Sequence, residues 1–149
     1  MSKAWLLDVN VLLAWLWPPH EAHKAAQSWM HNHRKESWAT CPVTEMAFLR
    51  IVTNRSFSPN APKWAEAVKL LLKHTANSSH HLFWQDSLSL AELDLQLGRR
   101  IQGPNQITDA YLLALSMHND GRFVTFDYRM QSLASPGSPE LAALEILRP

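Results

Sequence analysis

The sequence predicts an α/β fold, in which a mostly parallel sheet of about five strands lies at the centre and helices cover both of its faces. Short apolar runs alternate along the chain with longer segments of helical periodicity, the order expected of parallel strands joined by crossover helices. The 149 residues contain no repeat, low-complexity tract or linker that would split them. We therefore expect a single domain over residues 1–149.

The N-terminal part of the chain supplies the first two strands. Residues 4–7 form a continuous apolar run, typical of a strand that is buried on both faces. A helix over residues 9–17 follows and must stop at the double proline after it. A second helix over residues 20–35 places small and aromatic residues on one face. Residues 37–41 are the second strand, and a helix over residues 42–54 begins with a proline and should end near an asparagine.

The middle of the chain is predicted from turn residues and apolar spacing. Residues 56–62 are expected to form a loop, with Pro62 in the first turn of the next helix. That helix should bury one face, consisting of Trp64, Val68, Leu71 and Leu72. Residues 81–84 read as the third strand, residues 87–97 as a helix, and residues 98–104 as a loop that carries two arginines.

The C-terminal part completes the sheet. Residues 106–118 have a clear amphipathic helical pattern that ends near Asn119-Asp120-Gly121. A strand over residues 123–126, a helical turn over residues 128–133, a loop over residues 136–139 and a last strand over residues 144–147 follow.

Composition narrows the class of protein. Apolar residues make up 46% and charged residues 18%, an ordinary globular balance. The net charge of +1 gives no global field that would attract nucleic acid, so any such contact must come from local patches. Cys41 is the only cysteine, which excludes an intramolecular disulfide and a zinc thiolate cluster. The apolar residues 5–17 are broken by Asp8 and Asn10 and are too short to span a bilayer, so we expect a soluble, cytoplasmic protein.

Four acidic residues are expected at one edge of the sheet: Asp8, Glu45, Asp109 and Asp127. Asp8 and Asp127 directly follow strands, and Glu45 and Asp109 lie in the first turns of helices, which begin at the same edge. Gathered carboxylates repel one another and must be desolvated, so a fold tolerates them mainly when a cation lies between them. An all-oxygen site of this kind suits Mg²⁺ or Mn²⁺ and supports phosphodiester displacement.

Each acid also has a simpler interpretation. Asp8 and Asp127 can cap a turn or a helix, and Glu45 and Asp109 can complement helix dipoles. It is the joint pattern of four acids in an apolar frame that favours a metal site.

Two polar neighbours extend the candidate site. Asn10 can orient a ligand or a metal-bound water, or it can cap the helix. Thr125 shares a strand face with Asp127, where its hydroxyl can position a water or a phosphate, although β propensity alone also explains it. The eight histidines offer a metal-independent acid–base pair or a zinc site instead, but none is expected beside the acidic edge.

The segments around the acids resemble the four blocks of PIN-domain nucleases. These blocks are Asp8-Val9-Asn10-Val11-Leu12-Leu13, the run from Pro42 to Arg50 around Glu45, Thr108-Asp109-Ala110-Tyr111-Leu112, and Val124-Thr125-Phe126-Asp127. Their order and spacing match over nearly the whole chain, and the run Arg50-Ile51-Val52-Thr53-Asn54 makes it most similar to the VapC toxins of type II toxin–antitoxin pairs.

The resemblance implies a Mg²⁺- or Mn²⁺-dependent endoribonuclease that cuts tRNA or other structured RNA. It also implies a homodimer and a cognate VapB-like antitoxin, and no membrane partner. We expect Asp8, Asp109 and Asp127 to be the direct metal ligands and Glu45 to act directly or through water. Arg50, Arg99, Arg100 and Arg129 are the main candidates for RNA phosphates, with Arg55 and Arg122 beside them, although each can be an ordinary surface arginine.

Other interpretations stay open at this point. Trp15 and Trp17 can form a dimer or antitoxin surface, or pack in the core. A receiver or phosphatase-like protein also gathers acids at a sheet edge, but a receiver needs paired acids after its first strand and a late lysine, whereas Asp8 follows Leu7 and no lysine follows Lys73. A non-catalytic module that binds a metal ion or RNA is the other alternative.

Overall fold

Five parallel strands form one sheet in the computed structural model, which describes residues 3–93 and 95–149. In spatial order the sheet runs β3-β2-β1-β4-β5. The strands are β1 (Trp5–Leu7), β2 (Trp38–Thr40), β3 (His81–Phe83), β4 (Arg122–Thr125) and β5 (Leu144–Ile146). The predicted α/β class with a parallel sheet is therefore confirmed, and β1 lies at its centre between β2 and β4.

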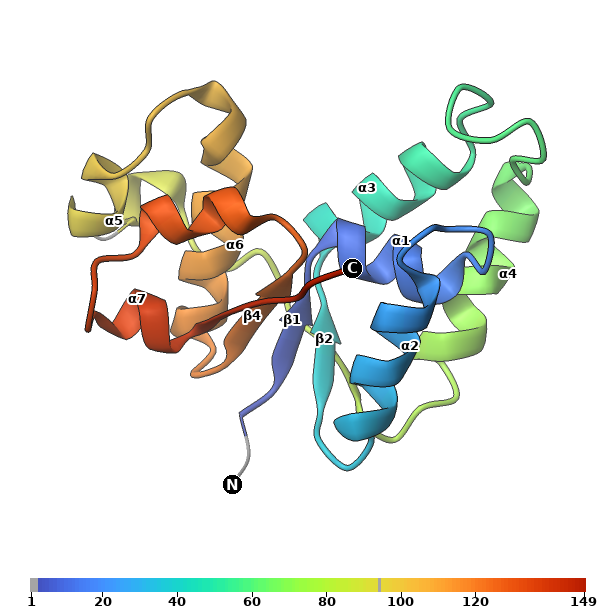
Figure 1. The fold of residues 1–149 in the computed structure, drawn as a ribbon, viewed down its shortest axis with the longest axis horizontal. Coiled ribbons are helices and arrows are strands. Elements are labelled where there is room, and N and C mark those ends of the chain that lie inside the picture. The colour runs from blue at the N-terminus through green and yellow to red at the C-terminus, as the bar shows by residue number, and fades with distance from the viewer. Residues whose placement is uncertain (1–2, 94) are drawn as a thin grey trace.

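Helices cover both faces of this sheet (Figure 1). On one side lie α1 (Val9–Leu16), α2 (His23–Asn32), α3 (Pro42–Val52) and α4 (Trp64–Thr75), and on the other α5 (Leu95–Arg99), α6 (Ile107–His118) and α7 (Pro139–Ala142). Alternation along β1 divides the core accordingly: Trp5 and Leu7 pack with the first group of helices, and Leu6 packs with the second. Both faces are apolar, which explains why the strands read as continuous hydrophobic runs.

Three predicted segments differ from the structure. The helix predicted over residues 20–35 is shorter, because α2 covers only His23–Asn32. The helix predicted over residues 87–97 is wrong: a 3₁₀ turn, η1 (Leu90–Glu92), precedes α5 there, and the Ser89 side chain accepts a hydrogen bond from the backbone of Ala91 and so fixes the turn. The arginine-bearing loop is also shorter, since α5 extends through Arg99 and a second 3₁₀ turn, η2 (Pro104–Gln106), leads into α6.

The loop predicted over residues 136–139 runs directly into a helix that was not predicted. Ser138 caps α7 by accepting from the backbone N–H of Leu141, and Pro139 occupies its first turn, so local capping chemistry starts the helix. The helical turn predicted over residues 128–133 is present as the 3₁₀ helix η3 (Tyr128–Leu133).

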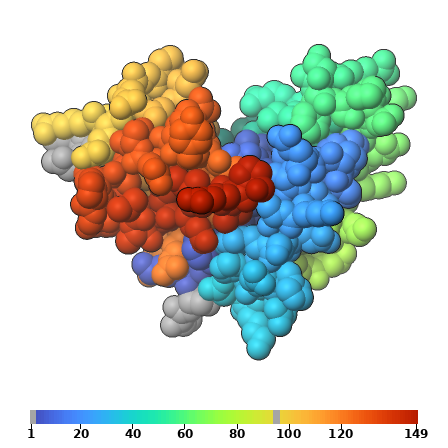
Figure 2. All heavy atoms as spheres, in the orientation of Figure 1, coloured from blue at the N-terminus to red at the C-terminus, as the bar shows by residue number. Residues whose placement is uncertain are grey.

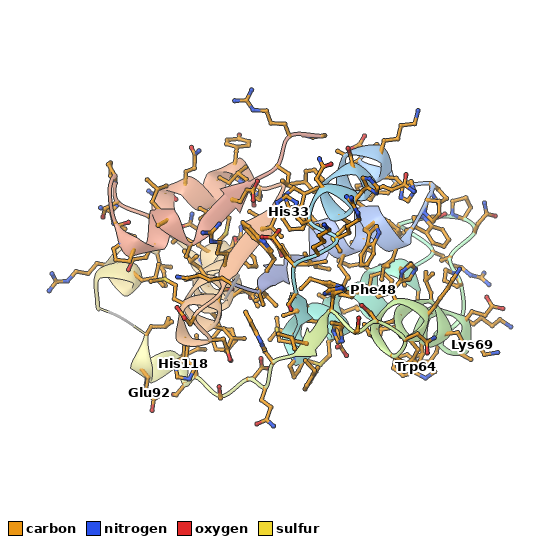
Figure 3. All side chains as sticks on the ribbon, turned by 90° about the horizontal axis from the view of Figure 1, so that it is seen from below. His33, Phe48, Trp64, Lys69, Glu92 and His118 are labelled. Carbon is orange, nitrogen blue, oxygen red and sulfur yellow. The ribbon has the colours of Figure 1, made fainter. Side chains whose placement is uncertain are left out.

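Helix α4 is only partly buried. Trp64 is 66% and Leu72 50% exposed, so the prediction that both are buried is wrong. The helix lies at the margin of the molecule and packs through Ala67 and Leu71. Figure 3 shows Trp64 near the periphery and Phe48 of α3 inside the core. Among the described residues no helix is both long and apolar enough to cross a bilayer.

Candidate active site at the carboxyl edge of the sheet

Asp8 is the buried centre of the predicted acidic edge. It directly follows β1 and caps α1, and only 5% of it is exposed. One carboxylate oxygen, Oδ1, accepts from the backbone N–H of Val9 at 2.7 Å, and the other, Oδ2, accepts from the hydroxyl of Thr125 at 2.7 Å. Asp8 can therefore cap α1 and belong to the site at the same time, because the helix begins at the edge of the parallel sheet where the site lies.

Thr125 links the residues around Asp8. It is fully buried at the end of β4, the neighbour of β1. Besides donating to Asp8, its Oγ1 accepts from the backbone N–H of Asp127 at 3.0 Å and from the side-chain amide of Asn10 at 3.1 Å. Asn10 in turn accepts from the backbone N–H of Phe126 at 3.1 Å. Asn10 is thus not a helix cap but a bridge between α1 and the end of β4.

Three of the four acids influence one another electrostatically. The pKa of Asp8 is raised from 3.8 to about 6, chiefly by burial; the hydrogen bond from Thr125 opposes the rise, and the nearby carboxylates of Asp109 and Asp127 add to it. The pKa of Asp109, in the first turn of α6, is raised by burial and then by Asp127. These shifts mean that Asp8, Asp109 and Asp127 lie within electrostatic reach of one another.

Asp127 has a counter-ion within its own turn. The guanidinium of Arg129 donates from Nε to Oδ1 at 2.9 Å and from Nη2 to Oδ2 at 3.0 Å, and the Arg129 backbone N–H also donates to Oδ1. The side-chain hydrogen bonds of Arg129 lower the pKa of Asp127. Arg129, which the sequence suggested for RNA phosphates, therefore occupies the outermost carboxylate of the site.

Glu45 is held by partners of its own. Its Oε2 accepts from the hydroxyl of Thr40, at the end of β2, over 2.6 Å. The Thr40 hydroxyl also lies 2.8 Å from Nε2 of His81 on β3. Because the single hydroxyl proton goes to Glu45, His81 Nε2 must donate to Thr40, which defines a chain of hydrogen bonds from His81 through Thr40 to Glu45.

The sequence did not predict these hydrogen bonds from His81 through Thr40 to Glu45. The expectation that no histidine lies beside the acidic edge is wrong for His81, which is two hydrogen bonds from Glu45. The available signal was Thr40 itself, a polar residue at the end of the apolar run that leads to Glu45. Its link to His81 depends on the pairing of β2 with β3, which the sequence does not contain.

The donor set suits a hard divalent cation. The groups gathered here are carboxylate, hydroxyl and amide oxygens, which Mg²⁺ and Mn²⁺ prefer, and a cation would offset both the burial of Asp8 and the repulsion from its neighbours, which raise its pKa. As the side chains stand, however, residues 3–93 and 95–149 contain no group of three or more His, Cys, Asp or Glu placed to hold an ion. Release of Asp127 from Arg129 would free both of its carboxylate oxygens for an ion.

The remaining arginines lie around the molecule at different distances from this edge. Arg50 is exposed in the last turn of α3, Arg99 is exposed at the end of α5, and Arg100 is half-buried after it. Arg122 begins β4 at the opposite edge, where its guanidinium lies 5.2 Å from the ring of Trp5. Figure 2 shows a notch in the molecular outline between the segments drawn in yellow and orange and those drawn in teal and green, which include α3.

The two tryptophans considered for a partner surface pack against the protein itself. Trp15 meets the ring of Trp38 edge-on at 5.0 Å, and Trp17 packs against the core on the same side of the sheet. Both are half-buried, which agrees with the core-packing interpretation.

Thr125→Val is expected to destabilise the fold by about 1–3 kcal/mol, because it strands a buried carboxylate oxygen and the donors of Asn10 and Asp127. Urea unfolding monitored by tryptophan fluorescence measures this change. Thr125→Ser keeps the hydroxyl and should lose less than half as much; equal losses would mean that the methyl group, not the hydrogen bonds, matters.

A profile of the PIN domain matches residues 5–136 of the chain. Ribonuclease VapC44 of Mycobacterium tuberculosis (strain ATCC 25618 / H37Rv) is 39% identical over 133 residues, which cover 89% of this chain and 92% of that protein. Ribonuclease VapC38 of the same strain is 40% identical over 129 residues, covering 87% and 89%.

Two solved structures share the fold. VapBC2 from Rickettsia felis, bound to a DNA fragment from its promoter, aligns with a TM-score of 0.64 at 15% identity and covers 97% of this chain and 98% of that chain. Mycobacterium tuberculosis VapC20, a toxin that cleaves the sarcin–ricin loop, aligns with a TM-score of 0.59 at 11% identity and covers 92% and 98%.

Proposed function

This chain belongs to the PIN-domain family and, within it, to the VapC ribonucleases, and from that premise we propose that it is a divalent-metal-dependent endoribonuclease. The observation that carries the proposal is the gathering of three acids at the carboxyl edge of the sheet, where burial raises the pKa of Asp8 and the nearby Asp109 and Asp127 add to the shift. A bound Mg²⁺ or Mn²⁺ would supply a hydroxide-generating water and stabilise charge on the phosphate.

Asp8, Asp109 and Asp127 are the proposed ligands of that ion. Thr125 and Asn10 hold the Asp8 carboxylate in one orientation, since its Oδ2 receives the Thr125 hydroxyl and Asn10 is tied to the backbone of Phe126. This placement holds the most buried of the proposed ligands in position before the ion arrives, so that only the outer side chains have to move.

Glu45 has a separate proposed role. Thr40 fixes its carboxylate on the neighbouring strand end, so it is placed to orient a water at the margin of the site rather than to bind the ion directly. His81, as a donor to Thr40, keeps the hydroxyl proton directed at Glu45.

The substrate class is RNA, with tRNA or another structured RNA as the proposed target. The two relatives at 39% and 40% identity are named ribonucleases, and VapC20, which shares the fold, is a toxin that cleaves the sarcin–ricin loop. Arg50, Arg99 and Arg100 are proposed contacts for phosphates that flank the cut, and Arg129 joins them once it leaves Asp127.

The proposed partners are a cognate VapB-like antitoxin and a second copy of the chain. VapBC2, which shares the fold, is a complex of toxin and antitoxin, and this supports the first of these. We further propose that the protein works in the cytoplasm, where its RNA substrates are.

A cleavage assay with purified protein and a tRNA pool tests the function. Cleavage should require millimolar Mg²⁺ or Mn²⁺, stop with EDTA, and leave 5′-phosphate ends, because water rather than the RNA 2′-hydroxyl attacks. Cyclic 2′,3′-phosphate ends or activity in EDTA would overturn the metal mechanism. Metal and RNA binding without any cleavage would identify the chain as a non-catalytic binding module.

A further inference from the structure

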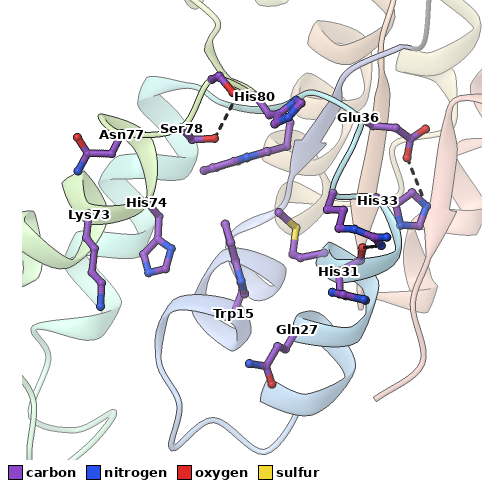
Figure 4. Close-up of a pocket in the computed structure, with 14 residues that line it drawn as sticks. Trp15, Gln27, His31, His33, Glu36, Lys73, His74, Asn77, Ser78 and His80 are labelled. Carbon is purple, nitrogen blue, oxygen red and sulfur yellow. Dashed lines mark hydrogen bonds and ion pairs between the residues drawn. The ribbon is translucent and has the colours of Figure 1, made fainter.

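A cavity of about 590 Å³ lies at the amino edge of the sheet, away from the acids (Figure 4). Its walls come from the ends of α2 and α4, from the start of β2 and from the loop that leads into β3. The acid site is built at the opposite, carboxyl edge of the sheet, so the cavity is a separate feature of the fold.

The walls of this cavity combine positive charge with aromatic surface. Arg34 and Lys73 are exposed cations at its rim, and four histidines also line it. The one acidic residue in the lining, Glu36, lies 3.8 Å from His33. Arg34 donates one N–H to the backbone of His31 at 2.9 Å, which anchors the guanidinium and leaves its other donors for a ligand.

The inner wall is a set of packed rings. Trp15 contacts Trp38 at 5.0 Å and His74 at 4.9 Å between ring centroids. Burial and the neighbouring Lys73 lower the pKa of His74, so that its ring adds neutral aromatic surface beside Trp15. Trp15 is half-buried, and therefore presents part of its ring to the cavity.

We propose that this cavity binds a nucleotide unit of the RNA substrate, with a base against Trp15 and its phosphate held by Arg34 and Lys73. Aromatic surface interleaved with cations is the combination with which proteins bind single-stranded nucleic acid. An acidic peptide would use the cations but not the rings, and the lining offers little aliphatic surface, with Met30 as its contribution. The inference rests on the proposed ribonuclease function only in taking RNA as the occupant.

Strand β2 connects the cavity with one of the acids, Glu45. Trp38 and Thr40 lie on the same face of β2, two residues or about 7 Å apart along the strand. Trp38 lines the cavity, and Thr40 holds Glu45. On the edge strand β3, exposed Phe83 pairs in register with Thr40 and offers a further ring at the level of Thr40.

The test compares two double variants that lose the same formal charge. Arg34→Gln with Lys73→Gln removes the cavity cations, and Lys35→Gln with Lys69→Gln removes two exposed lysines outside it. The probe is a fluorescein-labelled, single-stranded 2′-O-methyl RNA of about 12 nucleotides, in EDTA, so that neither metal-activated water nor a 2′-hydroxyl can cut it. Fluorescence anisotropy measures the dissociation constant over a range of salt concentrations.

The cavity variant should bind about tenfold more weakly at low salt and lose roughly 1.4 from the slope of log K against log salt, while the control changes less than about twofold. In the unmodified protein, titration with adenosine monophosphate should shift the indole N–H signal of Trp15. Equal binding by the two variants, an unmoved Trp15 signal, or equally good competition by polyglutamate would overturn the proposal. Since the assay contains no metal, these outcomes are independent of whether the protein cleaves RNA.

Discussion

Asp8→Asn is expected to reduce RNA cleavage at least about a thousandfold and, at the same time, to make the metal-free protein more stable at pH 7. The loss follows because Asp8 is the most buried of the proposed ligands and is held in place by Thr125. The gain follows because an amide of the same shape needs no desolvation of charge and feels no repulsion from Asp109 and Asp127.

The direction of the pKa shift of Asp8 determines how the free energy of unfolding changes with pH. The pKa of Asp8 is raised from 3.8 to about 6, so the folded state favours the protonated form. The cost of ionising Asp8 is therefore absent below pH 3.8, grows as the pH rises towards about 6, and is complete above that. A shift of this size corresponds to about 3 kcal/mol at most. The stability difference between Asp8→Asn and the unmodified chain should grow over this interval and then level off.

Urea unfolding at a series of pH values, in EDTA, measures this difference. Asp120→Asn is the matched control, because Asp120 is exposed and has a positive φ of 53°, a conformation that asparagine accepts equally well. The control should change neither cleavage nor the pH profile. A less stable Asp8→Asn protein at pH 7 would mean that the hydrogen bonds of the carboxylate outweigh its burial.

Topology made the acidic edge predictable from sequence. Parallel strands joined by helices send every strand end to the same side, so Asp8 and Asp127 could be placed together from their positions after apolar runs. The same rule placed Asp109 at the start of α6, within electrostatic reach of Asp127. It could not show that Glu45 is held by Thr40 instead, because that contact depends on the orientation of one side chain.

The features that the sequence did not predict lie at the margins of the fold, where contacts between distant segments decide the structure. The cavity rings meet because α1 and α4 converge on β2, and no local pattern contains that convergence. Trp64 has the spacing of a buried residue, yet its helix lies at the margin and leaves it exposed, since periodicity defines a face but not what covers it. The ion pair between Asp127 and Arg129 is local, but two residues of opposite charge in a turn carry no signal of which partner each prefers.

Saturating Mg²⁺ or Mn²⁺ is expected to raise the thermal unfolding midpoint of the protein by roughly 5–10 °C. At a hundred times its dissociation constant a ligand of the native state stabilises it by about 2.7 kcal/mol, and a domain of this size gains about 2–4 °C for each kcal/mol. Differential scanning fluorimetry with increasing metal measures the shift without any RNA. Asp8→Asn should show a higher midpoint in EDTA and little response to metal, which separates the two effects of this carboxylate.

Arg129 should oppose the metal in this experiment. Its guanidinium already holds both oxygens of Asp127, so an ion that needs this carboxylate must displace it. Arg129→Gln is therefore expected to lower the metal concentration at half-maximal stabilisation by several-fold. The effect is of this order because the variant removes one exposed ion pair and one positive charge near the ion. Arg55→Gln, an exposed arginine in the loop after α3, should leave it unchanged. A higher concentration requirement in Arg129→Gln would instead make Arg129 a residue that orients Asp127 for the ion, and the pair would then be part of the metal-bound site rather than its competitor.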